Sequence, residues 1–234
     1  MNKKGSHVGF VISFMLFITF VIFMYLILNS RIDFGQDKAN SLEYVKSEIT
    51  ERVSGSLTTA SVDLNNPGSN CVELSNFLGI AGIGNRVMVR SDSGNILNAG
   101  ISGQSLQVER NGNTFFRVYG SEEFSQTAGS LGSCQSLSEG QGYILGLVRD
   151  SEEIFESKII ALSNNYTGDY EALKKDMNIG SGDEFGFIFT YADGTAIKTP
   201  GQNVTINVYV DRIPVQYIKT NAAKENGFID ILVW

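Results

Sequence analysis

Histidine and cysteine, which often supply catalytic bases, nucleophiles and metal ligands, are scarce in this chain. His7 is the only histidine, and it stands before a long apolar run. The remainder therefore has no imidazole for a Ser-His-Asp triad, for a histidine zinc site or for activating a cysteine nucleophile. We expect no catalytic residue, no metal centre and no cofactor, and hence a protein that is not an enzyme.

Acidic residues leave two weaker alternatives open. Asp92 with Asn95, Asp183 with Glu184, and Asp193 offer the oxygen ligands that Ca²⁺ binds, but their spacing is not that of an EF-hand. Turn chemistry also accounts for Asp92 and Asp193 without a metal. A glycosidase carboxylate pair is defined by its separation in space, so an extracellular hydrolase stays the weakest hypothesis.

The only two cysteines are Cys71 and Cys134. Disulfides persist outside the cytosol, so a bond between these residues is the natural interpretation if this part of the chain lies outside. The alternative is a pair of free thiols. The bond would close a loop of about 60 residues and contribute about 3–4 kcal/mol to stability on the chain-entropy model.

Two sequons offer a further kind of chemistry. Asn165-Tyr166-Thr167 and Asn203-Val204-Thr205 match the N-glycosylation pattern. Both fall at predicted loops or strand starts, so Asn165 and Asn203 would accept glycans in a host that glycosylates. Chance occurrence in an Asn-rich chain is the competing explanation.

Most of the elements that must carry these residues follow a strand pattern, with apolar residues alternating or in short runs. Asn111-Gly112 and Asp193-Gly194 predict two hairpins, Pro214 predicts a sheet edge or a bulge, and residues 120–142 predict a long loop. The expected strands cover residues 86–90, 96–97, 106–110, 114–119, 142–149, 185–191, 197–198, 204–210, 213–218 and 228–234.

The predicted fold class is therefore mainly β with a long N-terminal helix, an α+β chain whose outer domain is an antiparallel sheet or sandwich. One short helix is expected at 169–177, where Asp169 can cap the first turn and lysines suit the last. Residues 152–163 fit a helix or a strand equally well. The β-rich domain would span 58–234.

Residues 8–28 form an almost unbroken apolar run. As a helix, 21 residues are about 31 Å long, which matches the hydrocarbon thickness of a bilayer. A cleaved secretory signal is the competing interpretation, but its apolar core is usually shorter and it ends in a small-residue cleavage site. We expect a single-pass anchor in contact with membrane lipid through 8–28. An amphipathic helix over 29–57 would continue from it, with apolar residues three or four apart.

Charge assigns the two sides of this anchor. Only Lys3 and Lys4, among 18 basic and 25 acidic residues, precede residue 29, so the rest of the chain has a net charge of −9. The positive-inside rule places residues 1–7 in the cytoplasm and the acidic domain outside the cell membrane. A nucleic-acid partner is not expected, because binding would need a basic surface.

The apolar helix also carries two patterns suited to packing against copies of itself. Phenylalanines at Phe10, Phe14 and Phe17 begin a row that follows one helix face. Gly5, Gly9 and Ser13 form a row of small residues that permits close helix approach. Bulk facing lipid is the alternative explanation for the phenylalanines.

A long helix that is apolar first and amphipathic second, after Lys3-Lys4-Gly5-Ser6-His7-Val8, resembles the N-terminus of archaeal type IV pilin-like proteins with a class III signal. That resemblance implies cleavage between Gly5 and Ser6 by a prepilin peptidase-like enzyme. Phe10 stands where many pilins have an acidic residue. The chain is also similar to uncharacterised archaeal single-span proteins that share the stretch at 182–187 and a terminal strand ending in Trp234.

Two functions follow as hypotheses. The first is a pilin-like structural subunit of a cell-surface filament, self-associating through its N-terminal helix. The second is a membrane-anchored extracellular binding or accessory module that does not polymerise and that binds a ligand through the 120–142 loop. Cleavage of the leader favours the first, and an intact Met1–Gly5 segment favours the second.

Overall fold

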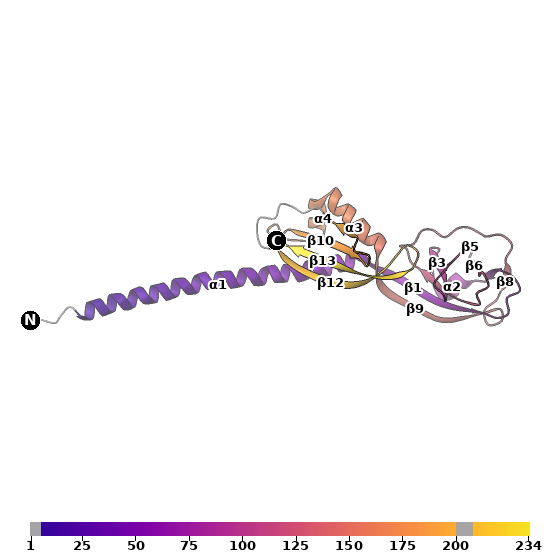
Figure 1. The fold of residues 1–234 in the computed structure, drawn as a ribbon, viewed down its shortest axis with the longest axis horizontal. Helices are drawn as coiled ribbons and strands as arrows, with labels where there is room; N and C mark the ends of the chain where they lie inside the picture. The colour runs from indigo at the N-terminus through magenta and orange to yellow at the C-terminus, as the bar shows by residue number, and fades with distance from the viewer. Residues whose placement is uncertain (1–5, 200–207) are drawn as a thin grey trace, which may run out of the picture.

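A computed structural model describes residues 6–199 and 208–234 of the chain. The protein is elongated: one helix projects from the end of a β-rich domain, and its first half extends beyond the rest of the molecule (Figure 1). The prediction of a mainly β chain with a long N-terminal helix is confirmed. The strand 204–210 predicted from the sequence lies largely outside the described residues.

The N-terminal helix α1 spans Ser6–Val53 as one 48-residue element, about 72 Å long at 1.5 Å per residue. The expected end at residue 57 was wrong, because the chain enters strand β1 (Ser54–Leu64) directly. Ser54-Gly55-Ser56 has low helix propensity. Leu57 is buried on strand β1, in a cluster that includes Phe155. The apolar residue that the sequence assigned to the buried face of the helix therefore belongs to the buried face of a strand.

Thirteen strands form two sheets within the described residues, where the sequence predicted about ten. The larger sheet has the order β11-β10-β13-β12-β9-β1-β7-β3-β4, and the smaller has the order β5-β6-β2-β8. Most neighbours are antiparallel, as expected, except β12 with β9 and β2 with β8. The strands after β1 are β2 (Cys71–Leu74), β3 (Val87–Ser91), β4 (Ile96–Leu97), β5 (Ala99–Ser102), β6 (Ser105–Glu109), β7 (Phe115–Gly120), β8 (Gln135–Leu137), β9 (Tyr143–Phe155), β10 (Phe185–Tyr191), β11 (Ala196–Lys198), β12 (Tyr209–Ile218) and β13 (Lys224–Val233).

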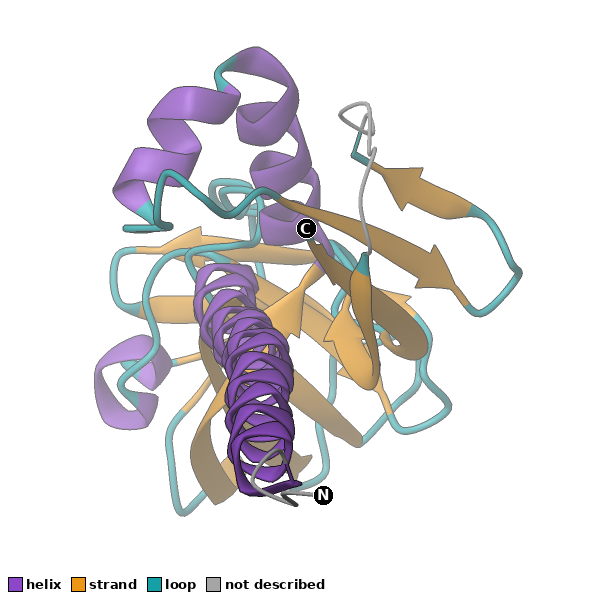
Figure 2. Cartoon of the chain, turned by 90° about the vertical axis from the view of Figure 1, so that its left-hand side faces the viewer, coloured by secondary structure: helices purple, strands orange, loops and turns teal. Residues whose placement is uncertain are grey.

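The half of the domain nearest α1, here called the proximal lobe, is built on β10, β11, β12 and β13. Helices α3 (Glu156–Gly168) and α4 (Tyr170–Asp176) lie beside this part of the sheet (Figures 1 and 2). Its core joins α1, the two short helices and the strands through Val45, Ile49 and Val53, each about 1% exposed. The amphipathic half of α1 is therefore part of the domain core.

The far half, the distal lobe, is a sandwich of the remaining strands and the short helix α2 (Phe77–Ala81). Its core is separate and holds side chains from both sheets, including Val62, Leu106 and Phe116, which have no exposed surface. The long strands β1 and β9 pair along nearly their whole length. A third apolar cluster, which includes Leu57, Phe124 and Ile218, packs residues of the two lobes together. The lobes are therefore joined by these two strands and by this cluster.

One predicted hairpin is confirmed and the other is wrong. β10 and β11 pair around Asp193-Gly194 as expected. Asn111 and Gly112 do adopt positive φ of 47° and 82°, as an Asn-Gly turn requires. However, β6 on one side pairs in the small sheet and β7 on the other pairs in the large sheet. The turn carries the chain from the small sheet to the large sheet, because β6 pairs with β2 and β5 whereas β7 pairs with β1 and β3.

Other expectations are refined in the same way. The ambiguous segment 152–163 contains the end of β9 and the first part of α3. The predicted helix at 169–177 is confirmed as α4, capped by the Asp169 side chain, which accepts a hydrogen bond from the Ala172 amide at 3.0 Å. The predicted loop 120–142 contains the short strand β8. Pro214 faces an edge, because β12 pairs with β9 only at Tyr217 and Ile218.

The buried face of α1 gives a testable prediction. Ile49→Ala should lower the free energy of unfolding by about 2–5 kcal/mol, because Ile49 is 1% exposed in the proximal core. Ser47→Ala, on the exposed face of the same helix, should change it by less than about 0.5 kcal/mol. Urea unfolding followed by the fluorescence of Trp234, the only tryptophan, measures both. Equal effects of the two substitutions would contradict the burial of this face.

Candidate functional site

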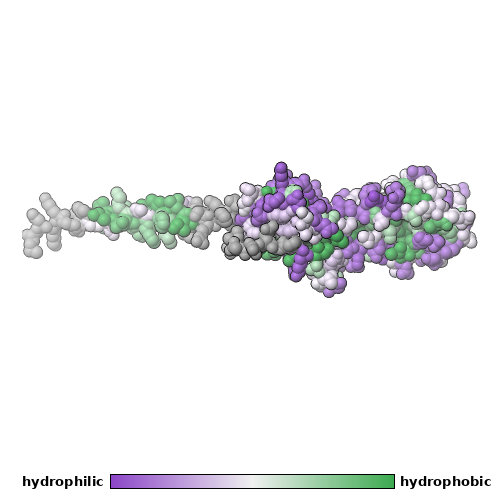
Figure 3. Space-filling view, turned by 90° about the horizontal axis from the view of Figure 1, so that it is seen from above, coloured by the Kyte–Doolittle hydropathy of each residue, from purple (hydrophilic) through white to green (hydrophobic). Residues whose placement is uncertain are grey.

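The projecting half of α1 is the largest apolar surface of the described chain. Residues Gly9–Ile27 are uncovered, and they include Phe10, 74% exposed, and Leu16, 68% exposed. This segment is the apolar arm at the left of the space-filling view, ahead of a domain whose surface mixes polar and apolar residues (Figure 3). Its length and composition suffice to cross a membrane, although a signal sequence would pass the same test.

The residues predicted to pack helices together lie on this uncovered arm. Phe14 and Phe17 are 58% and 62% exposed, and Ser13 is exposed beside them. A Cβ added to Gly9 would meet nothing within 4 Å, so the single chain gives no reason for a glycine there. Gly5 lies outside the described residues, and only the backbone of Ser6 is described.

Below this arm, α1 is fastened to the proximal lobe by a polar contact that sequence reasoning missed. Lys38 is only 8% exposed. Its ammonium group donates to Asp183 Oδ1 at 2.5 Å and to the Gly182 carbonyl at 3.1 Å. Ser41 Oγ donates to the other oxygen, Asp183 Oδ2, at 2.5 Å. The carboxylate thus holds two residues one turn apart on α1, and we call this group the helix clamp.

The neighbouring Glu184 continues the clamp into the domain. Its carboxylate accepts hydrogen bonds from Lys174 Nζ at 2.7 Å and from the Tyr170 hydroxyl. Its backbone exchanges two hydrogen bonds with Trp234, at 2.9 and 3.0 Å. The stretch 182–187 and Trp234 are separate features of the sequence. In the structure they form one unit, which contacts α1 at Lys38 and Ser41.

Three more polar contacts fasten α1 farther along its length. Two of them reach the end of α4 and one reaches β12: Tyr44 Oη donates to the Met177 carbonyl at 3.0 Å, Arg52 Nη1 pairs with Asp176 at 2.7 Å, and Lys46 Nζ pairs with Asp211 at 2.8 Å. Exposed ion pairs of this kind contribute little energy individually. Together the three contacts hold α1 from both α4 and the sheet.

Burial and hydrogen bonding act in opposite directions on the clamp carboxylates. Burial raises the pKa of Asp183, but the hydrogen bonds from Lys38 and Ser41 outweigh it and hold this pKa below its ordinary value. The pKa of Glu184 is lowered in the same way, by Lys174 and Tyr170 against burial. Burial, helped by Glu184, raises the pKa of Tyr170. At neutral pH both carboxylates are therefore charged and the phenol is neutral.

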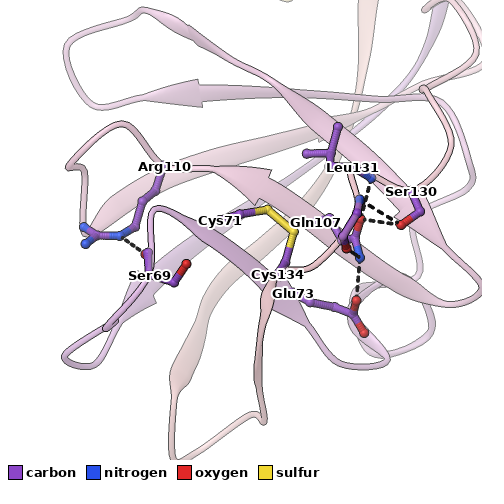
Figure 4. The surroundings of a disulfide bond; sticks show 9 residues. Ser69, Cys71, Glu73, Gln107, Arg110, Ser130, Leu131 and Cys134 are labelled. Carbon is purple, nitrogen blue, oxygen red and sulfur yellow. Dashed lines mark hydrogen bonds between the residues drawn. A yellow bond between two sulfur atoms is a disulfide. The ribbon is translucent and has the colours of Figure 1, made fainter.

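The predicted disulfide between Cys71 and Cys134 is confirmed. It ties the start of β2 to the 120–142 loop, as Figure 4 shows. Beside it, the buried Gln107 side chain donates to Glu73 at 2.6 Å and accepts from the Leu131 amide at 2.7 Å. The loop, which the sequence suggested was long and exposed, is thus held by a covalent bond and by a buried amide.

The remaining predicted site residues are not brought together. Asn165 is exposed in the last turn of α3 rather than in a loop, and Asn203 lies outside the described residues. Asp92 is near Arg117 at 3.6 Å, and Asp193 accepts hydrogen bonds from Thr195. Among the described residues, no three His, Cys, Asp or Glu side chains form a group that could hold a metal ion.

Comparisons of this chain with protein-family models, with curated protein sequences and with solved structures found no match. The fold and the site must therefore be interpreted from their own geometry. That geometry defines a two-part molecule: an uncovered apolar arm, and a domain that holds the rest of the same helix through a buried face and a clamp.

The clamp predicts a dependence of stability on acid. Because the folded-state pKa values of Asp183 and Glu184 are lowered, their contribution is present above the unfolded values near pH 4 and is lost as pH falls through the folded values. Asp183→Asn should reduce the loss of stability below about pH 4. Urea unfolding at pH 7, 5 and 3.5 tests this. Asp92→Asn, at an exposed carboxylate, is the control. An unchanged acid dependence in Asp183→Asn would contradict the prediction.

The disulfide predicts a separate result. Thiol labelling of native protein should find no free thiol before reduction, since both cysteines are bonded. Replacing both by serine should lower the free energy of unfolding by about 2–5 kcal/mol, because the bond closes a loop with a sequence separation of 63. Two thiols that label readily without a reductant would refute the bond.

Proposed function

We propose that the protein is a single-pass, membrane-anchored surface protein and a pilin-like subunit of a cell-surface filament. The observation that carries this proposal is the division of one continuous helix. Val45, Ile49 and Val53 are buried in the domain, whereas Gly9–Ile27 is uncovered along its whole length. A subunit that must pass from a membrane into a filament core needs such an arm, which can exchange lipid for other copies of itself.

The surface of the arm supports self-association more specifically than a plain anchor requires. Gly9 and Ser13 stand four residues apart, and small residues at this spacing allow helix backbones to approach closely. Phe10, Phe14 and Phe17 give the arm exposed aromatic rings that could pack against a neighbouring helix. A lipid anchor needs only hydrophobicity, and leucine would supply it equally well.

The rest of the chain supports a non-catalytic role. Residues 29–234 have a net charge of −9 with the acidic residues spread over their length, and the two buried charged side chains among the described residues, Lys38 and Lys174, serve the clamp. In the proposal, residues 1–7 face the cytoplasm and the domain faces outward. A prepilin peptidase-like enzyme would cut between Gly5 and Ser6.

The proposal is tested in cells that express the full chain. Mass spectrometry of the purified protein should find Ser6 as the first residue, and electron microscopy should find filaments. Gly9→Leu should leave processing intact but reduce filament number severalfold, because it widens the helix contact. Met15→Leu, a change of similar size on the same arm, should leave filaments unchanged.

The outcomes separate the two hypotheses. An intact Met1–Gly5 segment together with the absence of filaments would contradict the proposal and favour a membrane-anchored module that does not polymerise. Filaments that form equally well in Gly9→Leu would contradict the assignment of the Gly9–Ser13 row as a packing surface while leaving the anchor in place.

A further inference from the structure

A groove on the outer face of the large sheet, far from the helix clamp, has the composition of a binding site. It has a volume of about 440 Å³ and is lined by side chains of β1, β7, β9 and the start of β13. This volume lies in the usual range for ligand sites. The groove is separate from the 120–142 loop, from which the sequence had predicted ligand binding.

Strand alternation explains how the groove forms. On β1, Ala60 and Val62 point into the distal core with no exposed surface, so Thr59 and Ser61 point to the opposite face. In register, Thr59 lies between Tyr119 and Arg149. The small hydroxyl residues of the central strand β1 are thus flanked by long side chains of β7 and β9, which form the two walls of the groove. The walls are about 10 Å apart, because they are separated by two strand spacings.

The next row repeats this arrangement with the charge on the other wall. Ser61 lies opposite Arg117 on β7, and Leu147 on β9 donates its amide proton to Ser61 Oγ at 2.9 Å. Leu147 is 74% exposed, the highest value among the large apolar residues of the domain. Phe115 follows Arg117 along the wall, with the guanidinium 5.5 Å from the ring centroid. An arginine therefore stands between two aromatic residues on β7, and Arg149 follows Leu147 on the opposite wall, β9.

The charge of the groove is opposite to that of the chain. Arg117, Arg149 and Lys224 face a single acid, Glu153, among the lining residues, whereas the whole chain has a net charge of −7. Lys224 is paired with Glu153 at 2.7 Å. The side chain of Arg149 makes no ion pair or hydrogen bond with any residue that the structure describes, and the only ion pair of the Arg117 side chain among these residues is a 3.6 Å contact with Asp92. Two guanidinium groups are thus available to an anion.

We propose that this groove binds an acidic polysaccharide, a chain of carboxylated sugars held through its carboxylates by Arg117 and Arg149. A guanidinium group matches a carboxylate with two parallel hydrogen bonds. The C–H faces of the sugar rings would pack on the apolar surface of Phe115, Tyr119 and Leu147. The Thr59 hydroxyl group would form hydrogen bonds with the hydroxyl groups of the sugar. The site does not depend on whether filaments form.

The sheet face favours a sugar chain over an acidic peptide. The backbone amides and carbonyls of β1 are already engaged in ladders with β7 and β9. A peptide strand binds sheets chiefly by hydrogen bonds to such backbone groups at an open edge. On this face only side chains are available, and they suit a ligand that carries its own carboxylates, hydroxyl groups and apolar ring faces.

The test uses the full chain in detergent micelles, titrated with trigalacturonate by isothermal calorimetry, with neutral maltotriose as the ligand control. Trigalacturonate should bind and maltotriose should not. Arg117→Gln with Arg149→Gln should weaken binding by at least about tenfold, from the loss of two charge-assisted contacts. Arg212→Gln, an exposed arginine on β12 paired with Asp230, should change it by less than about twofold.

A second variant separates the groove from general charge attraction. Thr59→Tyr fills the floor of the groove and leaves every charge in place, so it should abolish binding of trigalacturonate. An unchanged urea midpoint confirms that each variant is folded. Equal affinity in Thr59→Tyr, or in the double arginine variant, would overturn the proposal.

Two further outcomes would also overturn the proposal. A hexaglutamate peptide that binds as tightly as trigalacturonate would assign the groove to an acidic protein segment. Self-association of the chain that the double arginine variant abolishes, with no binding of trigalacturonate, would assign it to a second copy.

Discussion

The burial of one face of α1 in the proximal lobe is the interaction on which the rest of the structure depends. Val45, Ile49 and Val53 lie at helix spacing and each is almost completely covered. They meet aromatic residues of β10 and β12, among them Phe187 and Tyr217. The first half of this helix is uncovered, so the helix is held on the domain through its second half, chiefly by that buried face. The domain is folded around the second half of its own N-terminal helix.

The clamp lies on α1 between the uncovered arm and the buried face. Lys38 is buried there, and its charge is met by Asp183 and by a backbone carbonyl. A buried cation with partners is tolerated, whereas one without partners is strongly disfavoured. Pairing Lys38 therefore fastens the helix to the domain at this point. Because Glu184 is bonded to Trp234, the same point also secures the end of the described chain.

Periodicity predicted the local elements well and their partners poorly. The apolar spacing on α1, the Asp169 cap and the hairpin at Asp193-Gly194 depend on neighbouring residues, and the structure contains all three. The turn at Asn111-Gly112 has the expected backbone conformation, yet its flanking strands belong to different sheets. Pairing between distant strands depends on total burial, which no local pattern encodes.

The clamp shows the same limit for the candidate site. The sequence indicated Asp183 and Glu184 only as possible calcium ligands. In the structure Asp183 pairs with Lys38, 145 residues away, and Glu184 pairs with Lys174, 10 residues away. Nothing about Lys38 distinguishes it from other lysines in the sequence. The disulfide was predictable because two cysteines allow only one pairing. The basic groove was not predictable from the sequence. Arg117 and Arg149 come to the same groove only through the register of β1 with β7 and β9.

The central claim is that the uncovered arm packs against the arms of other copies. Cysteine cross-linking at Ser13 measures this most directly, since the native cysteines are bonded to each other. In surface material from cells expressing Ser13→Cys, mild oxidation should give dimers joined through the arm, and Ser47→Cys, on the exposed face of α1 within the domain, should give far fewer. Monomers alone from Ser13→Cys would contradict the account.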